Sequence, residues 1–393
     1  MPTKAAVKNS IVCPRPISPY DEILLTMVQS HGGFYNAHAH YDRADTLPAE
    51  YLNHIHLNPF RAASSSLKVK QHLTGDLHNG LAYTEEDLRA RMGRVIERQI
   101  ACGITLANTC IDATPDIGEN GQLAFRIALE LKDKYADRII IRLGPMPIFG
   151  FKEAKRWDVF AEAAAKADFI AGLPEKDDFS KPHERDGRVG FKKHIRMVME
   201  LGCQLKKEVH LHLDQANNPN ECGTETLLEG LDDWLDQPQI PDHEGPTVWV
   251  IHMISPSAYE EMRFRRMAEK LLRLNVGVIA CPSAAISMRQ LRSVSSATHA
   301  SIARVLELCK MRIPVLIGTD NICDIYVPQC SGDMLAEAIF GGHGIRFAYP
   351  HVWAKLVSGI PLNDVDRDAI GETLYQDMKV LTDIDPAWIP AVD

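Results

Sequence analysis

The stretch Phe34-Tyr-Asn-Ala-His-Ala-His-Tyr-Asp-Arg43 joins a short, largely apolar run to two histidines that are one residue apart. On a β-strand the side chains of His38 and His40 would point to the same face, so both imidazoles could reach one point. Neutral imidazole is the commonest protein ligand for zinc-like metals. His-x-His pairs also arise by chance on protein surfaces, so the rest of the chain must decide whether this pair binds a metal.

The composition is that of a globular protein with a large core, since 45% of the 393 residues are hydrophobic and 24% are charged. The formal net charge is −9 and the acidic residues are dispersed, so neither nucleic acid nor a membrane is expected as a partner. The nine cysteines include no Cys-x-x-Cys pair, which predicts reduced thiols and a cytoplasmic location. No apolar run resembles a signal-peptide core near the start or is long enough to span a bilayer.

From residue 34 onwards, strand-like and helix-like segments alternate along the chain. The predicted strands are Phe34–His38, Ile104–Ile111, Ile139–Leu143, Asp168–Leu173, Val209–Leu213, Thr247–His252, Val276–Ala280 and Val315–Thr319. The predicted helices are about 84–103, Gln122–Tyr135, Glu153–Lys166, Phe191–Lys206, Glu225–Leu235, Ala258–Leu274 and Ser301–Lys310. Regular alternation, with strands too apolar to have a wet face, predicts a parallel sheet covered by helices. The number of units, and the lack of a Gly-x-Gly-x-x-Gly turn after the first strand, favour a closed (β/α)8 TIM-type barrel over an open dinucleotide-binding sheet.

Residues 1–393 are expected to form this barrel as a single domain with two additions. A polar stretch at about 45–83 is predicted to be an insertion after the first strand, where barrel enzymes carry substrate loops. It either covers the mouth of the barrel, with contacts from His54, His56, Phe60 or Arg61, or is a solvated insertion. Residues 331–393 are expected to form a helical C-terminal region.

In such a barrel the chemistry lies at the C-terminal ends of the strands. The residues of metal-ligand type at those ends are His38, His40, His210, His212, His252 and Asp320. Each has an ordinary alternative: His252 could be a core histidine bonded to a backbone carbonyl, and Asp320 could cap the next helix. Buried ionisable groups are costly unless they are paired or bound to a metal, so their convergence at one end of one barrel predicts a metal site.

This pattern resembles the amidohydrolase superfamily, and the chain is most similar to its cytosine-deaminase-like branch. Further similar segments are Gly103-Ile-Thr105, Ile111-Asp112, Ala167–Pro174, His212-Leu-Asp-Gln215, Glu225-Thr226, Cys281-Pro282, Gly318-Thr-Asp-Asn321, Asp324 and Gly332-Asp-Met-Leu335. The resemblance implies a metal-dependent hydrolase that acts on carbon–nitrogen bonds other than peptide bonds. It also implies one divalent metal ion, with zinc first and iron or manganese as alternatives, held by His38, His40, His212 and Asp320.

Two histidines of the fifth strand compete for the metal. His212 lies nearer the C-terminal end of the strand, and counting back from Glu225-Thr226 also aligns it with the family's ligand. In the alternative alignment, which starts from Glu208-Val209-His210, the ligand is His210 and His212 faces the substrate. The alignment with His212 as the ligand is favoured.

The chain departs from the family at several positions. Gln215 stands where the family has its catalytic glutamate, and Gly144-Pro-Met-Pro147 replaces the segment whose glutamine holds cytosine. The fourth strand has no lysine of the kind that two-metal members use, and no flanking β-sandwich is expected. Cytosine itself is therefore not the expected substrate.

The predicted reaction is cleavage of a C–N bond in a small cyclic amide or N-heterocycle by metal-bound hydroxide. Asp320 would accept and return the proton, while His252 would polarise the substrate oxygen. Gln215 can donate a hydrogen bond but cannot shuttle a proton, which places hydrolytic deamination of an N-heterocycle second. The remaining alternative is a non-catalytic barrel that binds a metal or ligand.

The candidate catalytic residues are Asp320, His252, Gln215 and His210. The candidate substrate-binding residues are Arg43, Pro174 and Asn321. The expected partner is a small-molecule substrate, and a homo-oligomer is possible.

We predict that His38→Ala or His40→Ala removes most of the bound metal and all activity, because each substitution deletes a ligand. The barrel should stay folded, since the core supplies most of its stability. Metal analysis after dialysis, together with circular dichroism, measures both effects. Stoichiometric metal in both variants would show that the site has been placed wrongly.

Overall fold

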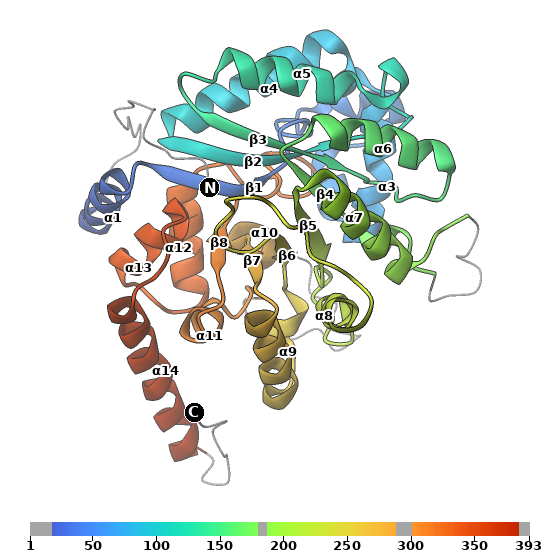
Figure 1. Ribbon diagram of the computed structural model, residues 1–393. Helices are drawn as coiled ribbons and strands as arrows, with labels where there is room; N and C mark the ends of the chain where they lie inside the picture. Colours follow the sequence, from blue (N-terminus) through green and yellow to red (C-terminus); the bar gives the residue numbers. More distant parts are fainter. Residues whose placement is uncertain (1–17, 180–186, 288–300, 385–393) are drawn as a thin grey trace.

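The computed structural model describes residues 18–179, 187–287 and 301–384, and Figure 1 shows its ribbon. Eight parallel strands form the centre of the molecule, as predicted. Their bounds are β1 Phe34–Ala39, β2 Ile104–Asp112, β3 Ile140–Met146, β4 Phe169–Gly172, β5 Glu208–Leu213, β6 Val248–His252, β7 Val276–Ala280 and β8 Val315–Ile317. Every strand in the described residues belongs to this barrel.

The strands close into a ring through two seams. One hydrogen-bonded set runs β1-β2-β3 and the other runs β4-β5-β6-β7-β8. At the first seam, the backbone N–H of Asp168 donates to the carbonyl oxygen of Leu143 at 2.8 Å. At the second, the backbone N–H of Asp320 donates to the carbonyl oxygen of His38 at 2.9 Å, beside a parallel bridge between Ala39 and Asp320. The predicted TIM-type barrel is therefore confirmed.

Helices surround the strands on the outside (Figure 1). They are α1 Pro19–Ser30, α2 Pro59–Ala63, α3 Leu67–His78, α4 Glu85–Ala101, α5 Leu123–Lys134, α6 Ala154–Lys166, α7 Phe191–Leu205, α8 Gly223–Asp233, α9 Glu261–Arg273, α10 Pro282–Ser287, α11 Val305–Lys310, α12 Met334–Gly344, α13 Pro350–Ser358 and α14 Asp364–Ile384. None of them, within the described residues, is long and apolar enough to cross a membrane.

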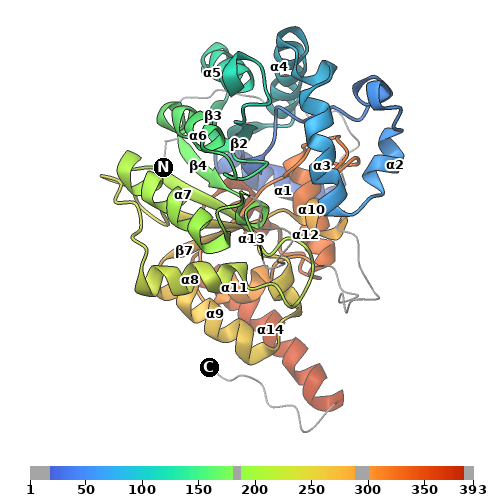
Figure 2. The ribbon, with the colours of Figure 1, turned by 90° about the vertical axis from the view of Figure 1, so that its right-hand side faces the viewer.

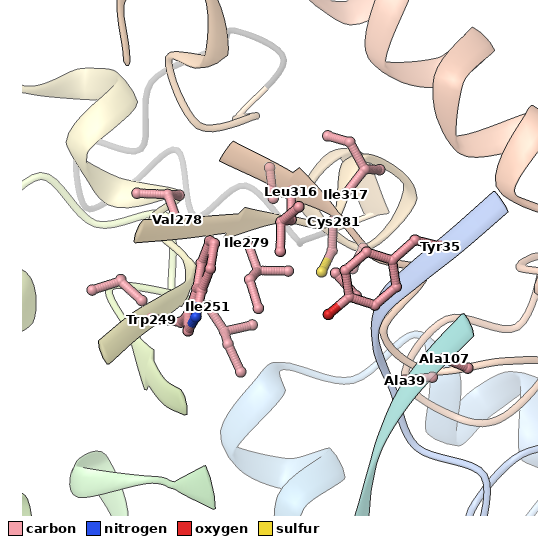
Figure 3. Packing of buried hydrophobic residues seen from close by; sticks show 14 of the residues in the cluster. Tyr35, Ala39, Ala107, Trp249, Ile251, Val278, Ile279, Cys281, Leu316 and Ile317 are labelled. Carbon is pink, nitrogen blue, oxygen red and sulfur yellow. The ribbon is translucent and has the colours of Figure 1, made fainter. Parts of the chain in front are cut away.

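The core follows from the apolar pattern of the sequence. Strands β1, β2 and β4 to β8 are buried at every position, because helices cover the outside and side chains fill the inside. Figure 3 shows side chains of β6, β7 and β8, among them Trp249 and Ile279, gathered in one cluster with Tyr35 of β1. Around this core α4 begins as predicted, since the Thr84 side chain accepts a hydrogen bond from the backbone N–H of Asp87.

The insertion at 45–83 is mostly helical, whereas the sequence suggested a loop. It contains α2, α3 and the short 3-10 helices Ala49–Tyr51, Asn53–Ile55 and Leu81–Tyr83. Figure 2 shows α2 and α3 outside the ring of strands, on the right-hand side of the view. The C-terminal region forms α12, α13 and α14, and α13 packs against both α1 and β1. The expectations for residues 1–17 and 385–393 lie outside the described residues.

Arg91 of α4 ties the insertion to the barrel. Its guanidinium is buried and donates to the carbonyl oxygens of Asp42 and Ala44, each at 2.7 Å, and to that of Ala82 at 2.6 Å. Its Nε also pairs with the Asp87 carboxylate at 2.8 Å. One side chain therefore holds the segment after β1 and the end of the insertion together.

We predict that Arg91→Met lowers the free energy of unfolding by about 3 kcal/mol, because it leaves buried carbonyl groups without donors. The exposed Arg94 on the same helix provides a matched control, and Arg94→Met should change stability by no more than about 0.5 kcal/mol. Urea unfolding followed by circular dichroism compares the two. Equal midpoints for both variants would contradict this role of Arg91.

Candidate active site

Five side chains meet at the C-terminal ends of four strands. His38 and His40 come from the end of β1, His212 from β5, His252 from β6 and Asp320 from the segment after β8. They form two overlapping groups, His38 with His212 and His252, and His38 with His40 and Asp320, whose ligand atoms lie within 4.8 Å of one another in each group. All five are buried. We refer to them as the ligand cluster.

The distances within the cluster are short. Oδ1 of Asp320 lies 3.3 Å from Nε2 of His38 and 3.3 Å from Nε2 of His40. Nε2 of His212 lies 3.2 Å from Nε2 of His38. The nitrogens and the carboxylate oxygen therefore converge on one small volume, as a set of metal ligands must.

Two members of the cluster lie on strained backbone. His252 has φ of 77° and Asp320 has φ of 61°, which is the left-handed region that residues other than glycine rarely adopt. Such conformations typically cost about 1–3 kcal/mol and persist only where the surrounding structure imposes them. They concentrate at functional sites, which is where these two residues lie.

The donor set fits a divalent metal. Burial lowers the pKa of His40 to about 3, and the nearby Arg43 guanidinium acts in the same direction. Burial likewise lowers the pKa of His212 well below its usual value and that of His252 to about 4. The imidazoles of His40, His212 and His252 are therefore neutral and keep a lone pair for coordination. Imidazoles and carboxylates are typical ligands for zinc and related metals.

The hydrogen bond of His212 supports the same conclusion, whereas the contact of His40 opposes it. Nδ1 of His212 lies 3.1 Å from the carbonyl oxygen of Gly172, so Nδ1 carries the proton and Nε2 is left with its lone pair. Nδ1 of His252 is buried and has no hydrogen-bond partner among the described residues. The Arg43 guanidinium contacts Nδ1 of His40. Coordination through Nε2 would place the proton on Nδ1, so this guanidinium would then have to move away.

A cavity of about 60 Å³ adjoins the cluster, which is room for several water molecules. Of the cluster, His40, His212, His252 and Asp320 line it. Of the predicted substrate-binding residues, Arg43 and Asn321 line it, whereas Pro174 is buried beside its wall residue Leu173. The insertion contributes Ser65, Leu67, Lys70 and Gln71 to the wall, in place of His54, His56, Phe60 and Arg61. We call this space the inner cavity.

His210 lies away from the ligand cluster. Its Nε2 is 3.2 Å from Oε2 of Glu208, and its ring stacks on Phe169 with the centroids 4.3 Å apart. Glu208 is paired in turn with Arg142 at 2.9 Å. His210 does not line the inner cavity, so the structure brings His212, and not His210, to the cluster. The prediction that His210 is catalytic finds no support in this arrangement.

Gln215 lines the inner cavity beside a residue that the sequence analysis missed. Its Nε2 donates to Oε2 of Glu175 at 3.1 Å, while Oε1 of Glu175 is buried and has no partner in the described part of the chain. Burial raises the pKa of Glu175 to about 8, and the neighbouring carboxyl of Glu221 acts in the same direction. The signal that could have revealed Glu175 is its position just beyond the end of the fourth strand.

We predict that His212→Ala loses the metal, whereas His210→Ala keeps it and loses only part of the activity. The reason is that His212 contacts His38, while His210 contacts Glu208. Metal content after dialysis distinguishes the two variants, with circular dichroism as the control for folding. Metal lost only from the His210 variant would reverse the assignment.

The chain was compared with protein families and with proteins of known sequence. No family model matches the chain. An uncharacterized protein of Haemophilus influenzae is 30% identical to it over 257 residues, which cover 64% of this chain and 82% of that protein.

Solved structures resemble the whole barrel. The 5-methylcytosine deaminase of Klebsiella pneumoniae, liganded with 5-fluorocytosine, is similar with a TM-score of 0.66 and 20% identity, over 87% of this chain and 82% of that one. The N-isopropylammelide isopropylaminohydrolase of Burkholderia multivorans has a TM-score of 0.59 and 17% identity, over 86% and 74% of the two chains. A COG1816 amidohydrolase of Burkholderia ambifaria with bound Zn has a TM-score of 0.56 and 13% identity, over 95% and 97%. The chain therefore shares the barrel fold of these deaminases and amidohydrolases, and it belongs to one family with the Haemophilus influenzae protein.

Proposed function

We propose that the protein is a metal-dependent hydrolase that cleaves a C–N bond in a small cyclic amide or N-heterocycle. The observation that carries this proposal is the ligand cluster, in which four imidazoles and one carboxylate converge beside a cavity. The similarity in fold to enzymes named as a 5-methylcytosine deaminase and an isopropylaminohydrolase supports the same reaction class.

His38, His40, His212 and Asp320 would hold the metal, with zinc as the first choice. The chemistry that a divalent metal supplies in such a site is to lower the pKa of water to about 7, so that a nucleophile is available at neutral pH. The remaining tasks fall to the side chains of this chain.

We assign the transfer of the proton to Asp320. Its carboxylate lines the inner cavity and lies against His38 and His40, so it can accept a proton from water in the cavity and return it to the leaving nitrogen. His252 also lines the cavity, and its unpartnered Nδ1 leaves the ring free to serve the metal or a developing charge on the substrate. Gln215 donates its amide N–H to Glu175, which leaves its amide oxygen to accept a hydrogen bond from a substrate N–H.

Hydrolytic deamination of an N-heterocycle other than cytosine is the second candidate, and Glu175 favours it. A deaminase of this kind needs a carboxylic acid that can protonate a ring nitrogen, and Gln215 cannot provide one. With a pKa of about 8, Glu175 is mostly protonated at neutral pH, and it lies one hydrogen bond away from Gln215. In this proposal Glu175, which follows the fourth strand, takes the role of the acid that Gln215 cannot fill.

The test is turnover of a panel of cyclic imides and N-heterocycles by protein loaded with zinc, iron or manganese. We predict metal-dependent turnover by the natural sequence and at least a tenfold lower rate for Asp320→Asn, because an amide cannot accept the proton. Asp364→Asn makes the same chemical change at an exposed position of α14 and should leave the rate unchanged. Release of ammonia identifies deamination, and a ring-opened product identifies amide hydrolysis.

Two results would contradict the proposal. A folded, metal-loaded protein that turns over none of the compounds would point to the non-catalytic barrel. If Asp320→Asn kept more than about a tenth of the rate, the base role of Asp320 would be wrong.

A further inference from the structure

A second and larger space, of about 310 Å³, lies next to the inner cavity. The two share Leu67 and Gln71 in their walls, so they meet along α3. The other walls of the larger space come from α3 and from the segments that follow β3, β4 and β5. These residues are Lys68, His72, Phe149, Lys152, Glu175, Lys176, Asp178, Arg188 and Ala216. We call this space the outer cavity.

The outer cavity concentrates positive charge. Its wall carries four cations, Lys68, Lys152, Lys176 and Arg188, against the two acidic residues Glu175 and Asp178. The four cations outnumber the two acidic residues, so the formal charge of the wall is positive. The chain as a whole has a net charge of −9, so this excess is opposite in sign to that of the protein. A local reversal of this kind concentrates anions.

The cations are close enough to act on one another. Burial lowers the pKa of Lys176 to about 8 against the opposing effect of Glu175, and Arg188, Lys68 and Lys152 act in the same direction as burial. These side chains come from separate elements, namely the start of α3 and the segments after β3 and β4. Lys176 and Arg188 are half-buried, while Lys68 and Lys152 are exposed at the rim of the cavity. Like charges repel one another, and an anion bound among them would reduce that repulsion.

We propose that the outer cavity binds an anionic oxygen group of the substrate, a phosphate ester or a carboxylate, while the reacting ring occupies the inner cavity. The part of this inference that concerns the ring rests on the proposed function. Arginine and lysine side chains are the usual protein partners of phosphate and carboxylate groups. The two cavities are adjacent, because Leu67 and Gln71 belong to the walls of both, and the proposal requires one molecule to extend from one cavity into the other.

The direct test is a calorimetric titration of the full, metal-loaded chain with inorganic phosphate, and in parallel with acetate. We expect saturable binding of at least one anion, which weakens as potassium chloride is added. The double variant Lys152→Gln/Lys176→Gln should bind that anion at least tenfold more weakly. The matched control is Lys155→Gln/Lys193→Gln, which makes the same charge change at exposed lysines outside the outer cavity and should bind it normally. Binding of phosphate alone would identify a phosphate ester, and binding of acetate alone would identify a carboxylate.

Two results would overturn the inference: no saturable binding of either anion, or equal weakening in both double variants. The metal sites are intact in all these proteins, so anion binding at the metal would appear equally in both variants and would not imitate the expected result.

A kinetic comparison separates this inference from the proposed function. For a ring that carries an anionic substituent, the KM of Lys152→Gln/Lys176→Gln should rise about tenfold, while the KM for the corresponding neutral ring stays unchanged. Turnover of neutral rings without anion binding would contradict the anion site and leave the proposed function standing. Anion binding that depends on Lys152 and Lys176, without turnover of any ring, would keep the anion site and remove the proposed function.

Discussion

The hydrogen bond from the backbone N–H of Asp320 to the carbonyl oxygen of His38, 2.9 Å long, joins the last strand of the barrel to the first. The strands can approach so closely because Gly318 has no Cβ, which would lie 2.7 Å from the backbone nitrogen of His38. Asn36 and Thr319 strengthen the same seam, with Nδ2 of Asn36 donating to the Thr319 hydroxyl at 2.9 Å. The contact that closes the barrel therefore also sets the Asp320 carboxylate against the histidines of β1. A change that opened the seam between β8 and β1 would therefore also move Asp320 away from His38 and His40.

The sequence predicted the barrel because its strands and helices obey simple periodicities, and it favoured His212 as a ligand because this residue lies nearer the C-terminal end of the fifth strand. His210 and His212 lie on one face of β5, about 6.6 Å apart along the strand, so only position along the strand distinguishes them. The helices of the insertion were missed for a physical reason. The buried side chains of α3 are Lys70, Gln71, Thr74, Leu77 and His78, which are mostly polar and give no clear apolar stripe. Glu175 was missed because it lies in the 3-10 helix Pro174–Lys176, which is too short to leave a periodic pattern in the sequence.

His78 at the end of α3 and Tyr83, a few residues further on, contact a buried pair of carboxyl groups, those of Asp42 and Asp112. The Tyr83 hydroxyl donates to Asp42 at 2.9 Å and to Asp112 at 3.2 Å, and Nε2 of His78 lies 3.0 Å from Asp112. Burial would raise the pKa of Asp112, but the Arg43 guanidinium and His78 lower it to about 2, while burial and the charge of Asp112 raise that of Asp42 to about 6. Asp112 is thus the charged partner that holds Arg43 beside the cavity. The insertion carries polar residues on its buried face because it packs on this network.

Glu175 stands between the two cavities, since it accepts a hydrogen bond from Gln215 of the inner cavity and lies beside Lys176 in the wall of the outer one. Its pKa is raised by burial and by the carboxyls of Glu221 and Asp214, and Lys176 is the cation that opposes them. An anion in the outer cavity would add negative charge near Glu175 and offset part of the effect of Lys176. Both changes raise the pKa of Glu175 and favour its protonated form. A substrate with an anionic group would therefore help to keep this carboxyl as an acid while the ring lies beside the ligand cluster.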